Sequence, residues 1–265
     1  MKIRAITGFF FIAVLIAVLL GGALIFVPFF ALVAALCAFE FYKMVATETV
    51  RPLRWIGTIA AFAVAAAVGC VQLGHLKAEQ LLWAVPFIFV VYISALFRKT
   101  PNPIQDISFT LTGFIYAAVP FLFFIALGFV QGDYNAYIPL GFLMLLWTND
   151  TGAYLAGRSF GRTKLFERIS PNKTWEGFIG GVVLAVVVAL NLQQYFGSLE
   201  RWEWVVVALI IGVFGTLGDL VESMFKRNLG VKDSGNILPG HGGFLDRFDG
   251  LLVAAPLVYL FLKLV

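Results

Sequence analysis

Nine apolar stretches, each of roughly 20 residues, constrain the fold of this chain more than any other feature, because a helix of that length crosses a bilayer. The stretches are uninterrupted, which excludes the alternating pattern of barrel strands. We therefore expect an all-α fold, that of a polytopic helical membrane protein with about nine transmembrane helices. The expected spans are residues 5–21, 23–42, 55–74, 80–97, 107–130, 137–157, 177–196, 203–225 and 246–264.

The composition supports a chain whose solvent is mostly lipid. Hydrophobic residues make up 61% of the 265 residues and charged residues only 13%, whereas a soluble domain carries about 25% charged residues. So many apolar side chains could not be hidden inside a water-soluble globule of this size. Cys37 and Cys70 both lie in apolar runs, so we interpret them as small buried hydrophobes rather than as a disulfide framework.

The first two spans lie very close together in the sequence. The first follows Lys2 and Arg4 and has the outline of a signal peptide, but no small-residue cleavage site comes before the next apolar run. We therefore expect a retained first span. Only Gly21 and Gly22 separate it from the second span, which predicts a tight hairpin.

The basic residues segregate to one side of these spans. With nine spans, 16 of the 19 Lys and Arg residues fall on the side of the N-terminus, and only Lys77, Arg201 and Lys263 fall on the other. This bias predicts a cytoplasmic N-terminus in the cell (inner) membrane. We interpret the net charge of +4 as the result of a basic cytoplasmic face, which attracts anionic lipid head groups and nucleotides. It requires no nucleic-acid partner.

The polar chemistry is concentrated in the second half of the chain. We expect residues 1–140 to form apolar N-terminal and middle transmembrane helices. Residues 141–265 are expected to form a catalytic transmembrane region with two basic cytoplasmic loops, 158–176 and 226–245.

Acidic residues mark the last two spans. Asp219 lies inside the apolar run V-F-G-T-L-G-D-L-V, about 10 Å of helix before Lys226. Asp246 and Asp249 lie three residues apart at the start of the final span. Because the two spans run antiparallel, we expect Asp219 and Asp246 to meet near the membrane surface. Mg²⁺ would relieve the repulsion between the two carboxylates and would take substrate phosphates as further ligands.

Two simpler interpretations of these acids stay open. Asp219 could pair with a nearby Lys or Arg and so hold helices together. Asp249 could simply favour the N-terminus of a helix through the helix dipole.

The loop at 226–245 has the residues of a phosphate site. Glycines such as Gly242 and Gly243 expose backbone N–H groups without a side chain in the way, although glycines alone would indicate an ordinary turn. His241 could donate to a phosphate, transfer a proton or make a structural hydrogen bond. The basic side chains that would neutralise phosphate charge are Lys226, Arg227, Lys232 and Arg247.

The loop at 158–176 shows a second anion-binding pattern. Ser170 followed by Pro171 predicts the start of a helix, and Lys173, Thr174 and Glu176 follow closely. A helix N-terminus beside a lysine is a natural anion site. Asp150 lies in the preceding apolar run, at a depth like that of Asp219. Arg158, Arg162, Lys164 and Arg168 are interpreted mainly as positive-inside residues.

The segment from Ser223 to Asp249 resembles the signature of the phosphatidate cytidylyltransferase (CDP-diacylglycerol synthase) family. It follows the pattern S-x-φ-K-R-x4-K-D-x-small-x2-φ-P-x-H-G-G-φ-x-D-R-φ-D, and the D-T-G-A-Y and S-P-N-K-T-W-E-G segments also look like the family's. The resemblance implies that CTP and phosphatidate, a membrane lipid, give CDP-diacylglycerol and pyrophosphate in phospholipid biosynthesis. It also implies Mg²⁺, optionally with K⁺, at a centre associated with Asp219 and Asp246, and a homodimer.

Residue chemistry and resemblance together give three sets of expected site residues. The expected catalytic residues are Asp219, Lys226, Arg227, Lys232, Asp233, His241, Asp246 and Arg247. The expected substrate-binding residues are Asp150, Ser170, Lys173, Thr174, Glu176, Gly242 and Gly243. The expected metal ligands are Asp219, Asp246 and Asp249.

Other activities are compatible with parts of this pattern. A CDP-archaeol synthase or a polyprenol kinase would differ mainly in the chemistry of the lipid chain. A CDP-alcohol phosphotransferase would need a D-G-x2-A-R pattern, which the residues after Asp249 do not provide. An ion-coupled transporter using Asp150 and Asp219 would place polar residues along a path across several spans, whereas here they gather at one face.

Overall fold

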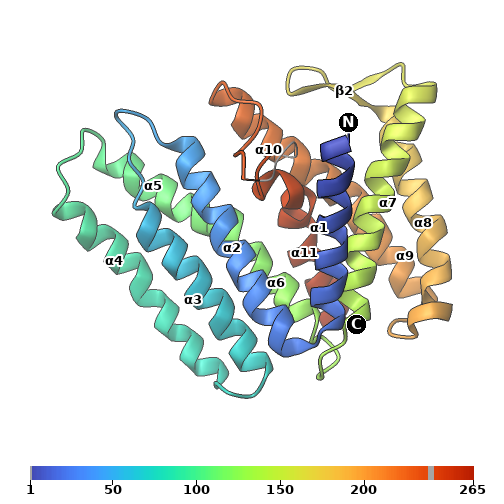
Figure 1. The fold of residues 1–265 in the computed structure, drawn as a ribbon, viewed down its shortest axis with the longest axis horizontal. Helices are drawn as coiled ribbons and strands as arrows, with labels where there is room; N and C mark the ends of the chain where they lie inside the picture. The colour runs from blue at the N-terminus through green and yellow to red at the C-terminus, as the bar shows by residue number, and fades with distance from the viewer. Residues whose placement is uncertain (1, 238–241) are drawn as a thin grey trace. The chain divides into compact units, whose positions relative to one another are not determined.

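A computed structural model describes residues 2–237 and 242–265, and these are predominantly helical (Figure 1). The helices group into two compact units. The first unit comprises Met1–Gly132 with Asp233–Arg247, and the second comprises Asp133–Lys232 with Phe248–Val265. The signature segment is thus divided between the two units.

The first unit consists of helices whose core is rich in phenylalanine. The rings of Phe26, Phe30 and Phe124 pack against one another, with centroids 4.8 Å apart for Phe30 and Phe124. Helices α2 and α3 lie side by side (Figure 1). The helical segments of this unit are α1 Lys2–Leu20, α2 Ala23–Val45, α3 Arg54–Gln72, the 3₁₀ segment Ala78–Ala84, α4 Val85–Leu96, α5 Pro103–Gly113, the π-helical segment Phe114–Ala118 and α6 Val119–Leu127.

The turn between α1 and α2 lies where two glycines were expected to form a hairpin. Helix α1 ends at Leu20 and α2 begins at Ala23. Gly22 has a φ of +92°, a backbone conformation that side chains of L-residues disfavour. The glycine therefore allows the chain to leave one helix and enter the next within two residues.

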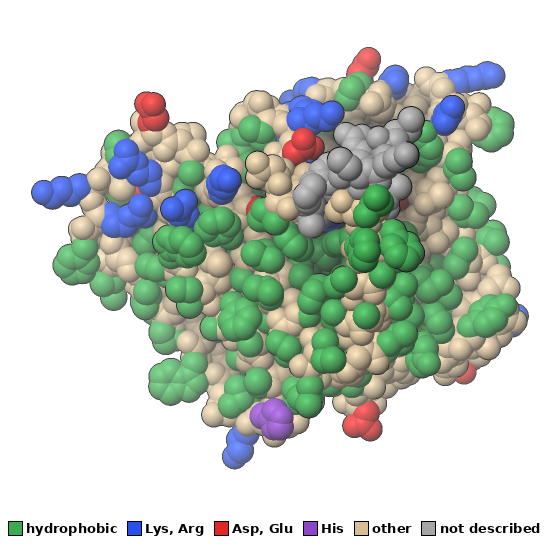
Figure 2. Space-filling model, in the orientation of Figure 1, with side chains coloured by type: hydrophobic (Ala, Val, Ile, Leu, Met, Phe, Trp, Pro, Cys, Tyr) green, Lys and Arg blue, Asp and Glu red, His purple; other side chains and the backbone are tan. Residues whose placement is uncertain are grey.

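The loops at one end of the first unit are tied together by hydrogen bonds. The Arg51 amide donates to Asp106 Oδ1 at 2.5 Å, and the Arg98 guanidinium donates to the Arg51 carbonyl at 2.8 Å. The loops that follow α2 and α4 therefore lie at the same end, as the charge pattern predicted. In Figure 2, blue Lys and Arg side chains gather at this end of the unit and green hydrophobic side chains cover its flank.

The second unit contains the remaining helices and one short hairpin. Helices α7 and α8 pack along each other (Figure 1), and Trp204 is fully buried in this unit. The elements are α7 Tyr137–Phe160, β1 Lys164–Phe166, β2 Ser170–Thr174, α8 Trp175–Phe196, α9 Arg201–Ile210, the π-helical segment Ile211–Gly215, α10 Thr216–Asn228 and most of α11 Leu245–Leu264. Residues 245–247 of α11 belong to the first unit. Strands β1 and β2 pair antiparallel.

The predicted class, an all-α membrane protein, is confirmed. A helical segment lies at each of the nine expected spans. Within the described residues, six helices are long and apolar enough to cross a membrane, and Ile6–Leu20 is a shorter apolar helix. Large side chains such as Trp83 and Leu96 are about 80% exposed (80% and 81%), which suits contact with lipid. Helices α7 and α11 fall outside the six, and both carry polar residues, including Asp150 and Asp249.

Candidate functional site

A cavity of about 570 Å³ lies in the second unit, beside the hairpin and three helices. Such a volume is in the usual range of small-molecule sites. Five of the predicted substrate and metal residues line it, namely Asp150, Ser170, Lys173, Thr174 and Asp219. Arg158, which was interpreted mainly as a topology signal, also lines the cavity, together with Tyr154 and Asn172.

The helix predicted to start at Ser170 begins later. Ser170 and Pro171 lie in strand β2, and α8 starts at Trp175 with Thr174 as its N-cap. The Thr174 hydroxyl accepts a hydrogen bond from the Gly177 amide at 3.2 Å. The predicted start was wrong because residues 170–174 instead pair with Lys164–Phe166. Lys164 strengthens this hairpin by donating to the Pro171 carbonyl at 2.6 Å.

Thr174 should therefore contribute measurably to stability. Thr174→Val keeps the shape of the side chain but removes the oxygen that accepts from the first turn of α8. We expect the free energy of unfolding to fall by about 1 kcal/mol, the usual value of an N-cap, measured as a lower Tm in detergent. Thr174→Ser should restore most of the loss, and a valine variant as stable as the parent would contradict the capping role.

Glu176 lies in the first turn of α8 but does not line this cavity. Its carboxylate accepts hydrogen bonds from the Arg162 and Thr163 amides, each at 3.1 Å. These contacts tie the start of the hairpin to the start of α8. Its predicted contact with substrate stays a prediction.

Asp219 has a cationic partner in the second unit. Its carboxylate forms an ion pair with the Lys173 ammonium, which comes from strand β2, and it accepts from the Ser223 hydroxyl at 3.2 Å. The Asp219 and Lys173 side chains are 35% and 26% exposed, so both stay accessible from the cavity. The pair joins the hairpin to α10, which agrees with the simpler interpretation of Asp219 as a helix-holding acid.

Helices α10 and α11 approach closely next to Asp219. A Cβ placed on Gly218 would lie 2.5 Å from the Asp249 carbonyl oxygen and 3.2 Å from the Gly250 Cα. Close approach at small residues is a common way for membrane helices to pack. It places the Asp249 carboxylate within electrostatic range of Asp219 and Asp150, which repel it, and of Lys173, which attracts it.

These carboxylates suit a cation that shares its ligands with a substrate. Among residues 2–237 and 242–265, no group of three or more His, Cys, Asp or Glu side chains is arranged to hold a metal ion. Mg²⁺ commonly takes only one or two carboxylates and completes its shell with water and phosphate oxygens. Asp219 and Asp150, both lining the cavity, fit that requirement.

The predicted basic residues of the second unit differ in exposure. Lys226 is buried and pairs with the fully buried Glu222 one turn earlier, at 3.2 Å. Its charge is therefore already balanced by a carboxylate. Arg227 is exposed and lies near the Val231 carbonyl, at 3.5 Å, and Lys232 is also exposed. Arginine and lysine at a water-facing position can reach a phosphate.

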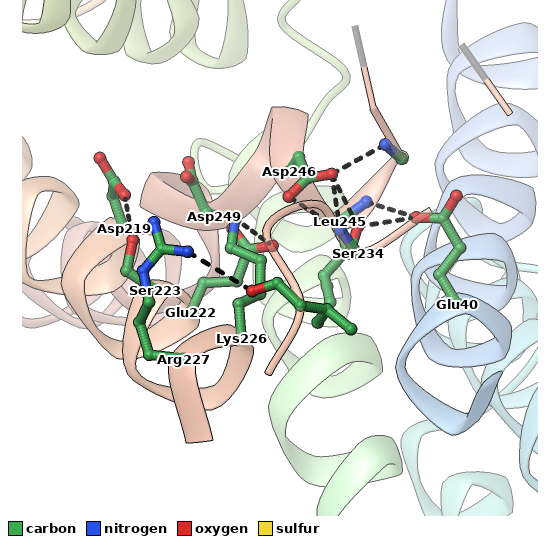
Figure 3. A network of polar contacts seen from close by, with 12 residues as sticks. Glu40, Asp219, Glu222, Ser223, Lys226, Arg227, Ser234, Leu245, Asp246 and Asp249 are labelled. Carbon is green, nitrogen blue, oxygen red and sulfur yellow. Dashed lines mark hydrogen bonds and ion pairs between the residues drawn. The ribbon is translucent and has the colours of Figure 1, made fainter. Parts of the chain in front are cut away.

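The part of the signature in the first unit is organised around Asp246 (Figure 3). The Asp246 carboxylate accepts from the Ser234 amide at 2.9 Å, the Ser234 hydroxyl at 3.0 Å and the Gly243 amide at 2.8 Å. Asp233 and Arg247 are exposed. His241 lies outside the described residues.

The predicted meeting of Asp219 and Asp246 stays a prediction. Asp246 belongs to the first unit and Asp219 to the second, and each has its own set of contacts.

Two residues with clear structural roles were not predicted from the sequence. They are Ser234, and Glu40 of α2, which contacts the same segment. Glu40 carried a usable signal, since it is an acid inside an apolar run.

Comparison with known proteins shows the family of this chain. The profile of the cytidylyltransferase family matches residues 2–265, so the chain belongs to this family of enzymes. Its relatives include proteins named phosphatidate cytidylyltransferase from Staphylococcus epidermidis, 36% identical over 264 residues, and from Staphylococcus aureus, 38% identical over 267 residues. Each alignment covers 99% of both chains. The resemblance noted in the signature is thereby confirmed over the full length.

Proposed function

We propose that this chain transfers the cytidylyl group of CTP to phosphatidate and forms CDP-diacylglycerol, a phospholipid precursor. An oxygen of the phosphatidate phosphate attacks the α-phosphorus of CTP. The bond from that phosphorus to the oxygen bridging the β-phosphate breaks, and pyrophosphate leaves with the electron pair. The attacking oxygen is already ionised at neutral pH, so the site needs no strong general base.

One observation carries this proposal best: a cavity lined by both a lysine and carboxylates, in a chain of the cytidylyltransferase family. Phosphoryl-type transfers depend mainly on positioning and on charge stabilisation. Lys173 is placed to neutralise a phosphate in the cavity, with Arg158 as a second cation on its wall. Asp219, and in this proposal Asp246, would hold Mg²⁺. When bound, that ion would neutralise charge on the CTP phosphates.

We further infer that this chemistry takes place at the cytoplasmic face. The positive-inside bias supports this orientation, as does the linkage of the loops after α2 and α4 at one end of the first unit. The lipid tails would then stay in the bilayer while CTP arrives from water. A homodimer, and K⁺ at the metal site, belong to the same proposal and rest on the family resemblance.

The decisive test is a substrate series. Purified protein in detergent is incubated with phosphatidate, Mg²⁺ and each nucleotide in turn, and the lipid products are identified by mass spectrometry. We expect CDP-diacylglycerol with CTP, and equimolar pyrophosphate. In a parallel incubation with a polyprenol in place of phosphatidate, a phosphorylated polyprenol, together with no CDP-lipid from phosphatidate, would indicate a kinase. Ion flux in liposomes without CTP turnover would indicate a transporter.

A further inference from the structure

Glu40 is a carboxylate in an unusual place. It lies in α2, an apolar helix of the first unit, and its exposed fraction is only 1%. Taking a carboxylate out of water is unfavourable unless hydrogen-bond donors replace the water. A buried acid in a membrane helix therefore usually has a specific partner.

Among the residues that the structure describes, the hydrogen-bond partners of Glu40 belong to the signature segment. Its Oε2 accepts from the Leu245 amide at 2.9 Å and from the Ser234 hydroxyl at 3.4 Å (Figure 3). Leu245 is the first residue of α11, and the first amides of a helix have no partner within the helix. A carboxylate is also favoured there by the positive end of the helix dipole. Glu40 thus holds the start of α11 although 205 residues separate it from Leu245.

Two glycines of the segment give the Glu40 carboxylate its space. A Cβ on Gly235 would lie 2.7 Å from Glu40 Oε1, and a Cβ on Gly243 would collide with Glu40 Oε2 and with the Ser234 hydroxyl. Both glycines are therefore needed for close approach to Glu40. The sequence therefore needs glycine at position 243 because this residue packs against the Glu40 carboxylate. Any contact of Gly243 with phosphate would be an additional reason.

The same contacts connect Glu40 to Asp246. The Ser234 hydroxyl lies 3.0 Å from Asp246 Oδ2 and 3.4 Å from Glu40 Oε2, and the Gly243 amide donates to Asp246. Glu40 thereby contacts Ser234, which itself donates to Asp246, and Leu245, the residue directly before Asp246 in the sequence. The position of the Asp246 carboxylate depends on both.

We propose that Glu40 is a positioning residue for cytidylyl transfer, acting through Ser234 and Leu245 to hold Asp246 in place. This inference rests on the proposed function, because it gives Asp246 its part in the reaction. It also assigns the N-terminal helices a role besides anchoring in the membrane. A small misplacement of a catalytic group can reduce the rate by about 10²-fold.

The test compares Glu40→Ala with Glu40→Gln. The alanine variant removes the acceptor, so we expect kcat to fall by about 10²-fold. The glutamine variant keeps an oxygen for Leu245 and Ser234 and places its NH₂ group at Oε1, which accepts no hydrogen bond from the described residues. We expect it to recover at least a tenth of the parent kcat, roughly a 10-fold gain over alanine. Wild-type kcat in Glu40→Ala would overturn the proposal.

Amide hydrogen exchange gives a readout that does not depend on activity. In Glu40→Ala, the peptide covering residues 242–250 should exchange at least about 10-fold faster, as expected when a local hydrogen-bonded segment opens more often. Asp106→Ala is a matched control, since Asp106 is also 1% exposed but accepts from Arg51 in another loop. It should leave exchange at 242–250 and the kcat of folded protein within about twofold of the parent.

The two proposals can fail separately. If the parent protein forms no CDP-lipid, the proposed function fails, and exchange alone decides whether Glu40 holds the segment. Unchanged exchange at 242–250 in Glu40→Ala overturns the positioning role. An equal loss of kcat in the Glu40→Ala and Asp106→Ala proteins would also overturn it, because that would indicate a general effect of removing a buried acid.

Discussion

Replacing Asp219 with asparagine should lower kcat by about 10³-fold or more, the scale of losing one main electrostatic group in an active site. The change removes the negative charge that pairs with Lys173 and that is proposed to hold Mg²⁺. The side chain keeps its size, so α10 should still pack against α11 at Gly218. The measurement is CTP-dependent release of pyrophosphate by purified protein with phosphatidate.

Two companion variants make this result interpretable. Ser223→Ala removes the hydroxyl that donates to Asp219 at 3.2 Å but leaves the carboxylate, so it should retain activity within about 10-fold, the scale of one hydrogen bond. Asp246→Asn should be as inactive as Asp219→Asn, but it should also loosen the segment, because Asp246 accepts from both Ser234 and Gly243. Near-normal activity in both Asp variants would contradict the metal assignment.

Replacing Lys173 with methionine should reduce kcat/KM for CTP by about 10²-fold. Methionine keeps much of the aliphatic length but removes the ammonium group, which lines the cavity and pairs with Asp219. Loss of a cation that stabilises a transferring phosphate has effects of this size or larger. Initial rates at varied CTP, with phosphatidate saturating, give the value.

Lys164→Met is the control for this prediction. Lys164 lies in the same hairpin and is exposed, but it donates to the Pro171 carbonyl at 2.6 Å and does not line the cavity. It should change kcat/KM by less than about fivefold, since surface contacts contribute little. If the Lys164 and Lys173 variants lost activity equally, the hairpin as a whole and not the Lys173 charge would be responsible.

The class of fold could be predicted because lipid leaves few alternatives. Backbone groups in a bilayer must be satisfied within helices or closed barrels, so apolar runs of the right length locate helices directly. Their ends were less predictable. The pattern Ser170-Pro171 is typical of a helix start, yet pairing with residues 164–166 determined the local structure, and Thr174 provided the cap three residues before Gly177.

The residues of the site could be predicted where charged and polar side chains are concentrated in short segments of the sequence. Asp150, Lys173 and Asp219 came from two loops and their adjoining spans, and all three line one cavity. Residue type alone does not reveal that the charge of Lys226 is balanced by Glu222 inside the unit, and the catalytic role of Lys226 stays a prediction. Glu40 was overlooked because its partners, Ser234 and Leu245, lie about 200 residues away (194 and 205), and one sequence does not reveal such a pairing.

The division of the polypeptide between its two units limits how this protein can be dissected. The backbone passes from one unit to the other after Gly132, after Lys232 and again after Arg247. Cleaving the chain at a single position therefore cannot separate the two units intact. A fragment beginning at Asp133 would carry every residue of the family signature but would lack Glu40, so isolating an autonomous C-terminal enzyme by truncation should fail.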